Sequence, residues 1–209
     1  MIQASGETVS ARFINLISSQ FPTLMNGSIS RGYALAMLSL CAFVSPMAKR
    51  KVVADKALST VTYAAKHPLH KWEGVSHDVN CAMIYNDDTK LPENVAVSIK
   101  VASFDSDNNN RDSHAIEVLD GLKYPNVTFV SSDISAGEGG ALVAKGNLTF
   151  HGVTKPVTLK AIRRDAGGKM TLTSEFPVKM SDHNVERPSL MGMKTEDDMT
   201  LKFNVVFAL

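Results

Sequence analysis

The chain has 209 residues, a formal net charge of +1, 44% hydrophobic residues and 21% charged residues. This length accommodates one domain with a substantial hydrophobic core. The balanced charge, together with the lack of a basic run interleaved with aromatic residues after Lys51, argues against nucleic acid as a partner.

The first 48 residues differ from the rest of the chain. An uncharged and mostly apolar run, Tyr33 to Val44, follows Arg31. A bilayer span needs about 20 apolar residues, so this run is too short and no stable membrane span is expected. A short apolar run behind a basic residue is typical of a secretory signal peptide. Met25 is a natural start for it, and we expect cleavage after Ala48.

Residues 1–48 are therefore expected to be an upstream extension and a signal peptide, removed or disordered, in a periplasmic or secreted protein. A buried hydrophobic helix is the alternative for the apolar run. Export would remove Cys41 and leave Cys81, so the mature protein could form no intramolecular disulfide. Cys41 could instead carry a lipid anchor, although the residue before such a cysteine is normally small and here it is Leu40.

From residue 59 onward, apolar and polar residues alternate with a period of two, as in half-buried strands. In the clearest run, Val95, Val97, Ile99 and Val101 share one face. Turn signals rich in Asn, Asp and Gly separate eight such segments. The segments are residues 61–63, 79–85, 95–101, 127–129, 142–150, 157–161, 170–178 and 199–207.

An antiparallel meander exposes two edges unless it closes, and closure into a barrel removes both. The sequence thus predicts an all-β fold, an eight-stranded antiparallel barrel over residues 59–209, preceded by a short linker at 49–58. Residues 109–122 break the alternation and place Ile116 and Leu119 three apart, which favours one short helix with Gly121 capping its end. The polar, broken stretch 181–194 is expected to be a loop near the barrel mouth.

Residues 146–159 carry the most specific signal. Leu148 and Phe150 alternate with polar residues before Gly152, and Val157 and Leu159 do so after it, so this stretch predicts a hairpin. It resembles the signature hairpin of the YceI-like family, bacterial lipocalin-like proteins that bind polyisoprenoid lipids. Two stretches upstream resemble the same family, and the resemblance extends over residues 59–207. They are Asn110-Arg111-Asp112-Ser113-His114 and Lys123-Tyr124-Pro125-Asn126-Val127-Thr128-Phe129.

The resemblance implies a lipocalin-like barrel that is not an enzyme and that holds a hydrophobic lipid, of the quinone or polyprenyl phosphate type, in its lumen. No cofactor other than this lipid is expected. Strands of about ten residues, rising about 3.3 Å per residue, would enclose a tunnel of order 30 Å, which suits an extended isoprenoid tail. An eight-stranded barrel can instead be filled by its own side chains, as in a ligand-free stress or interaction module.

The inward face of each strand is inferred from its alternation, and a slip of one residue would invert it. On that basis the predicted lumen residues are Val97, Ile99, Val101, Leu148, Phe150, Leu159, Phe176, Leu201 and Phe203. Arg111 and His114 join them because they belong to the family motif, and Arg111 could bind a phosphate or a quinone carbonyl through charge-assisted hydrogen bonds. Alternatively, Asp112 caps the helix, Arg111 pairs with a neighbouring acid and His114 packs beneath.

Six histidines permit a competing function. A metal-binding or enzymatic protein could use His67, His70, His114 or His151 at the mouth. However, the proline between the first two argues against a helix there, and no cluster of cysteines or carboxylates has ligand spacing. There is no Gly-x-Ser-x-Gly nucleophile elbow, and Cys81 lies in a strand pattern typical of a small core residue. The sequence therefore predicts no metal and no catalytic residue, and it leaves the oligomeric state open.

Overall fold

The computed structural model describes residues 48–209, so the expected extension and signal peptide lie outside the described residues, apart from Ala48. Ten strands form one sheet in the order β1-β4-β5-β6-β7-β8-β9-β12-β2-β3, and neighbouring strands are antiparallel. The strands are β1 (Lys49–Val53), β2 (Thr60–His67), β3 (His70–Ser76), β4 (Val79–Asn86), β5 (Leu91–Lys100), β6 (Asn126–Ala136), β7 (Ala141–Phe150), β8 (Val153–Ala166), β9 (Lys169–Lys179) and β12 (Asp198–Ala208). A separate two-stranded hairpin pairs β10 (Ser189–Leu190) with β11 (Met193–Lys194).

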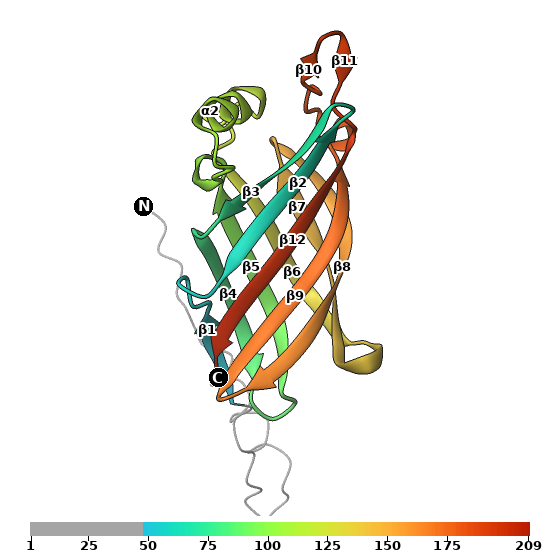
Figure 1. Ribbon diagram of the computed structural model, residues 1–209. Helices are drawn as coiled ribbons and strands as arrows, with labels where there is room; N and C mark the ends of the chain where they lie inside the picture. Colours follow the sequence, from blue (N-terminus) through green and yellow to red (C-terminus); the bar gives the residue numbers. More distant parts are fainter. Residues whose placement is uncertain (1–47) are drawn as a thin grey trace, which may run out of the picture. The chain divides into compact units, whose positions relative to one another are not determined.

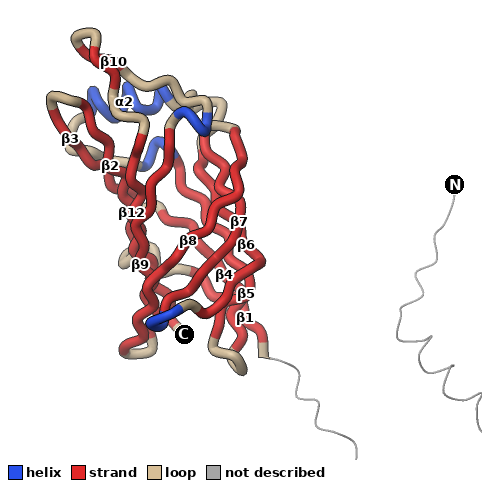
Figure 2. Tube along the Cα trace, turned by 90° about the vertical axis from the view of Figure 1, so that its right-hand side faces the viewer, coloured by secondary structure: helices blue, strands red, loops and turns tan. Residues whose placement is uncertain are grey.

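The ten-stranded sheet curls around an interior, as Figures 1 and 2 show, with β1 and β3 as its two ends. Ala54, which follows β1, forms a bridge with Phe207 of β12. A second bridge joins Val75 of β3 to Asp105, and the two residues exchange amide-to-carbonyl hydrogen bonds of 2.8 and 2.9 Å. These bridges hold both ends of the curled sheet, and the predicted antiparallel barrel is confirmed as a curled antiparallel sheet that forms a partial barrel.

The predicted number of eight strands is wrong, because the sequence analysis misses β1 and β3. β1 lies within residues 49–58, which that analysis assigns to a linker, and of its five residues only Val52 is buried. β3 has only two large apolar side chains, Trp72 and Val75. Neither strand alternates strongly enough to be recognised, since each is held by backbone pairing to a longer neighbour, β1 to β4 and β3 to β2.

The predicted hairpin is confirmed as β7 and β8, which are joined by a two-residue turn. Both turn residues, His151 and Gly152, have positive φ angles, of 49° and 74°. Two-residue turns with left-handed residues match the right-handed twist of the strands that they join. On the β7 side, Leu148 and Phe150 are buried, at 4% and 5% exposure, so the period-two pattern of the sequence marks the inner face correctly.

The predicted short helix is confirmed as α2 (Asn109–Val118), and the Asn108 side chain accepts a 3.1 Å hydrogen bond from an amide of its first turn. At the other end Asp120, not Gly121, adopts the left-handed conformation, with a φ of 44°. Gly121 follows it and donates its amide to the Ile116 carbonyl at 2.8 Å. Asp tolerates this conformation better than most residues, which explains the error of one position. Among the helices in residues 48–209, none has the length and apolar character needed to cross a membrane.

The two ends of the barrel differ. At the end that we call the mouth, α2, the β2–β3 turn and the β10–β11 hairpin gather (Figure 1). The stretch 181–194 lies there as predicted, although it contains that hairpin and a 3₁₀ turn (Ser181–His183) rather than loop alone. The opposite end carries the C terminus and is filled by Met83, Met170 and Phe207, which are at most 2% exposed. The barrel is therefore plugged at that end by its own side chains.

Candidate ligand-binding cavity

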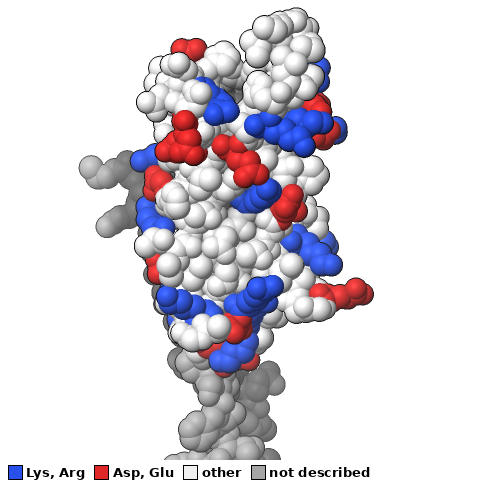
Figure 3. All heavy atoms as spheres, viewed as in Figure 1, with Lys and Arg blue, Asp and Glu red and all other residues white. Residues whose placement is uncertain are grey.

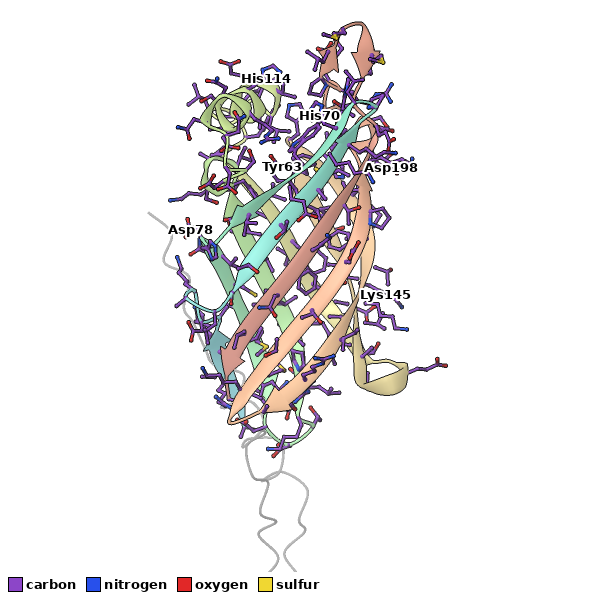
Figure 4. The ribbon with its side chains drawn as sticks, viewed as in Figure 1. Tyr63, His70, Asp78, His114, Lys145 and Asp198 are labelled. Atoms are coloured by element: carbon purple, nitrogen blue, oxygen red, sulfur yellow. The ribbon has the colours of Figure 1, made fainter. Side chains whose placement is uncertain are left out.

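A cavity of about 790 Å³ occupies the interior of the barrel. Its lining runs from Met83 and Phe207, near the plugged end, to His70 on β3 and His114 on α2, which lie at the mouth (Figure 4). Both histidines are exposed, so the cavity reaches the protein surface between these elements. Binding sites for small molecules typically have volumes of about 300–1,000 Å³, so this cavity lies in the upper part of that range.

The structure brings all eleven predicted site residues to this one cavity. Nine come from strands or the residue after one, and Arg111 and His114 come from α2. The nine are Val97, Ile99, Val101, Leu148, Phe150, Leu159, Phe176, Leu201 and Phe203. The inward faces inferred from the alternation are thus the faces that line the lumen. Whether these residues contact a ligand stays a prediction.

The lumen is open rather than packed. On the lining face, Val97, Phe176, Leu201 and Phe203 are only half-buried, although each is an inward member of its strand. Side chains that fill a packed barrel would be excluded from solvent, as the fully buried Met170 is at the plugged end. The half-buried residues therefore expose apolar surface to the cavity, which is what an apolar ligand would cover.

The polar groups of the mouth centre on Arg111. Its Nε donates to the Ser106 hydroxyl at 2.9 Å, its Nη2 donates to the Ser106 carbonyl at 3.1 Å, and its guanidinium carbon lies 5.9 Å from the centre of the Trp72 ring. Asp112 accepts hydrogen bonds from the same serine, from its amide at 3.2 Å and its hydroxyl at 2.6 Å. Two expectations are thereby corrected, because Asn108 rather than Asp112 caps the helix and Arg111 bonds a serine rather than an acid.

Tyr63 is a lumen residue that the sequence analysis leaves out of its lining set. Its ring meets Phe104 edge to face at 5.4 Å and covers Gly74 on β3, where a Cβ atom would lie 2.4 Å from the ring. Burial raises the pKa of Tyr63 above its ordinary value, and the negative charge of Asp112 adds to this shift. The neutral phenol can donate a hydrogen bond to a ligand. The period-two alternation could have identified Tyr63 as a lumen residue, because it lies two positions after Val61 and therefore on the same face of the strand.

A row of rings follows the β2–β3 turn at the mouth. His67 and His70 lie 5.3 Å apart, and His70 and Trp72 lie 5.1 Å apart, between ring centres. The Nδ1 atom of His67 accepts from the Leu69 amide at 3.2 Å, so its Nε2 carries the proton and donates to the Met193 carbonyl at 3.0 Å. Because both ring nitrogens are engaged and the side chain is buried, His67 ties the β2–β3 turn to the β10–β11 hairpin and is not free to bind a metal.

Two other histidines hold the β7–β8 turn in place. The Nδ1 atom of His151 donates to the His183 carbonyl at 3.0 Å, and the Nδ1 atom of His183 donates to the Val153 carbonyl at 3.1 Å. The Nε2 atom of His151 lies 3.4 Å from the carboxylate of Asp120, just beyond the end of α2. These contacts connect the turn with the helix and the 3₁₀ turn, so both rings serve the framework of the mouth.

The mouth histidines do not converge on a common point. His114, which one reading places beneath the helix, is instead exposed, and its Nδ1 atom lies 3.6 Å from the Glu117 carboxylate. Within residues 48–209, no group of three or more His, Cys, Asp and Glu side chains is placed to share a metal ion. The described residues therefore give no structural support to the metal-binding alternative.

Cys81 on β4 lines the cavity and is 4% exposed, and burial raises the pKa of its thiol to about 12. At pH 8 about one thiol in ten thousand is then ionised, against about one in four for an ordinary cysteine. We expect iodoacetamide to modify Cys81 about a thousandfold more slowly in the native protein than in denaturant. Mass spectrometry of the Cys81 peptide measures this ratio, and equal rates in both conditions would contradict the burial.

The fold and the cavity define a class of protein: a curled antiparallel barrel, plugged at one end, with an apolar ligand cavity open at the other. Within this class, the chain belongs to the YceI-like family, because the family profile described as a YceI-like domain matches residues 53–207. The resemblance of the β7–β8 hairpin to the family signature is thereby confirmed.

Relatives and solved structures agree with this assignment. The chain is 30% identical over 163 residues to Protein YceI of Salmonella newport, which covers 74% of this chain and 85% of the relative. Burkholderia cenocepacia BcnA superposes with a TM-score of 0.66 at 25% identity, covering 73% of this chain and 98% of that one. A polyisoprenoid binding domain from Saccharophagus degradans shares the fold, with a TM-score of 0.57 at 12% identity over 76% of this chain and 97% of its own.

Proposed function

We propose that the protein binds an isoprenoid lipid in the barrel lumen and carries or sequesters it outside the cytoplasm. The observation that supports this most directly is the open, apolar cavity, whose lining keeps Val97, Phe176, Leu201 and Phe203 half-buried. The solved domain from Saccharophagus degradans, which has this fold, is described as polyisoprenoid binding. The short apolar run before residue 48 supports export.

The apolar lining is sufficient to hold such a lipid. Burial contributes about 0.8 kcal/mol per methylene-sized group, so each five-carbon isoprene unit would contribute about 4 kcal/mol. Association costs about 4–15 kcal/mol in lost freedom, which about one to four buried units would offset. A micromolar dissociation constant needs about 8 kcal/mol beyond that cost. A tail of several isoprene units is therefore the ligand class that this lumen suits.

The arrangement of polar groups orients the ligand. Near the plugged end the cavity is lined by apolar side chains such as Met83 and Phe207, whereas the mouth offers the Arg111 guanidinium and the neutral Tyr63 hydroxyl. An isoprenoid would therefore insert tail first. Its quinone or phosphate head group would remain at the mouth, where a hydrogen-bond donor can meet its oxygens.

Mass spectrometry of an organic extract tests the proposed function. We expect the protein, purified from a bacterial host that exports it, to release an isoprenoid at close to one molecule per chain. If none copurifies, a folded sample is incubated with ubiquinone or undecaprenyl phosphate and extracted again. A folded protein that takes up neither compound would contradict the proposal.

A further inference from the structure

Large apolar side chains are unusually concentrated around the mouth. Within residues 48–209, nine large hydrophobic residues are exposed, and five of them lie on the three segments that surround the mouth. We call these five the collar. They are Leu69 in the β2–β3 turn at 57% exposure, Leu122 after α2 at 99%, and Leu190, Met191 and Met193 of the β10–β11 hairpin at 49%, 83% and 37%. The other four are dispersed over β1, the β1–β2 connection, β6 and β8.

The collar is continuous with the cavity. Leu190 belongs to the cavity lining and is also half exposed at the surface, so apolar surface extends from the lumen onto the hairpin. His67, whose Nε2 donates to the Met193 carbonyl, fixes the hairpin to the rim. A lipid that leaves the lumen at this point would meet apolar side chains before it meets water.

A lysine accompanies each of the three collar segments. Lys71 follows Leu69 by two positions, and Lys123 and Lys194 come directly after Leu122 and Met193. None of the ion pairs within residues 48–209 involves these three lysines. In Figure 3 the tip of the β10–β11 hairpin is white, and basic and acidic side chains lie together below it.

Of three acidic groups at the mouth, one forms an ion pair with a lysine outside the collar and two lie beside histidines, which are charged only when protonated. Glu117 lies beside His114, Asp120 beside His151, and Glu196 pairs with Lys66. Each collar segment thus presents an exposed apolar group next to a lysine that forms no ion pair within residues 48–209, although the Lys123 ammonium also lies 5.0 Å from the centre of the Tyr124 ring. This combination is typical of surfaces that insert shallowly into a bilayer interface and attract anionic lipid head groups.

We propose that the collar docks the barrel mouth onto a lipid bilayer that contains anionic phospholipids, and that the isoprenoid enters and leaves the lumen there. The docking surface itself stands on the collar and its lysines, while the exchange of ligand rests on the proposed function. The three collar segments are separate from one another around one opening. This arrangement favours a deformable lipid surface over a rigid protein partner, because a bilayer can accommodate each segment independently.

Flotation with phosphatidylcholine vesicles, with and without phosphatidylglycerol, tests the docking. The variant Leu122→Asp/Met191→Asp is compared with a matched control, Val130→Asp/Ile162→Asp, which alters two exposed apolar residues of the outer wall. All proteins are full-length chains, so residues 1–47 contribute equally. We expect the collar variant to lose about tenfold in binding to anionic vesicles and the control to change less than about twofold.

The same samples separate docking from ligand binding. We expect Lys71→Gln/Lys194→Gln to weaken binding to anionic vesicles and not to neutral ones. Organic extraction of each variant should give unchanged isoprenoid content. Collar-dependent vesicle binding by a protein that takes up neither ubiquinone nor undecaprenyl phosphate would support docking and reject the carrier function. Equal vesicle binding by the wild type, collar variant and control would overturn docking. Docking would also be overturned if the collar substitutions changed the oligomeric state in solution and left vesicle binding unchanged.

Discussion

Replacing Val97 by Trp is expected to lower the affinity of the protein for an isoprenoid about 100-fold or more. Val97 lies on the inner face of β5, where it is half-buried and lines the cavity. An indole at this position would occupy lumen that an isoprene unit needs, and one displaced unit removes about 4 kcal/mol of apolar burial. Each 1.4 kcal/mol is about a tenfold change in affinity, so the affinity would fall by close to three orders of magnitude if the tail kept its position. Rearrangement of the tail in the lumen would reduce this loss.

The matched control is Ala96→Trp, which places the same ring on the outer face of the same strand. Ala96 is exposed and pairs with Ala82 on β4 and Val130 on β6, so the control should keep the wild-type lipid content. Urea unfolding of both variants distinguishes an open lumen from a packed one. A packed interior would lose about 1–3 kcal/mol of stability through overpacking by Val97→Trp, whereas an open lumen accepts the ring. A destabilised Val97→Trp variant with normal lipid content would contradict the cavity.

Replacing Gly152 by Ala should destabilise the fold by about 3 kcal/mol. Gly152 has a φ of 74°, and a Cβ atom there would lie 2.4 Å from Cε1 of Tyr124. The left-handed conformation costs an alanine about 1–2 kcal/mol, and the forced displacement of the ring adds a similar amount. Tyr124 cannot move freely, because its ring packs edge to face on His151 at 5.0 Å and the Lys123 ammonium lies 5.0 Å from its centre.

Gly167 in the β8–β9 turn provides the control for this substitution. Its φ is 57°, but no atom lies within 4 Å of the position that a Cβ atom would take. Gly167→Ala should therefore show the conformational cost alone, about 1–2 kcal/mol by equilibrium unfolding in urea. In a Tyr124→Ala background, Gly152→Ala should cost no more than this. If the two alanine substitutions destabilise the wild-type background equally, the contact with Tyr124 is not the cause.

Hydrophobic alternation already determines the face of each long strand that lines the lumen. The nine predicted strand residues, from Val97 to Phe203, all reach the cavity because side chains in a strand point alternately to opposite sides. The same pattern predicts the β7–β8 hairpin, since Gly152 lies between two alternating runs. β1 and β3 escape prediction because pairing with β4 and β2 holds them, while their own side chains are mostly polar.

The helix was predictable in its position but not in its contacts. The sequence places Arg111 and Asp112 in a helix near the mouth, yet only the fold shows that both bond to Ser106, which precedes the helix. Likewise Tyr63 is recognisable as an inward residue, but its raised pKa depends on burial and on Asp112, which lies 49 positions along the chain. Contacts between residues distant in sequence follow from how the elements pack, which a local pattern does not contain.

The sequence by itself determined the class of fold, the family and the inner face of the barrel, because each depends on local periodicity or on a continuous motif. Only the tertiary structure decided that the lumen is open, that one end is plugged by Met170 and Phe207, and that the collar surrounds the other. A packed barrel and an open barrel have the same sequence pattern of alternating apolar residues. The curvature and closure of the sheet decide how much space remains between them.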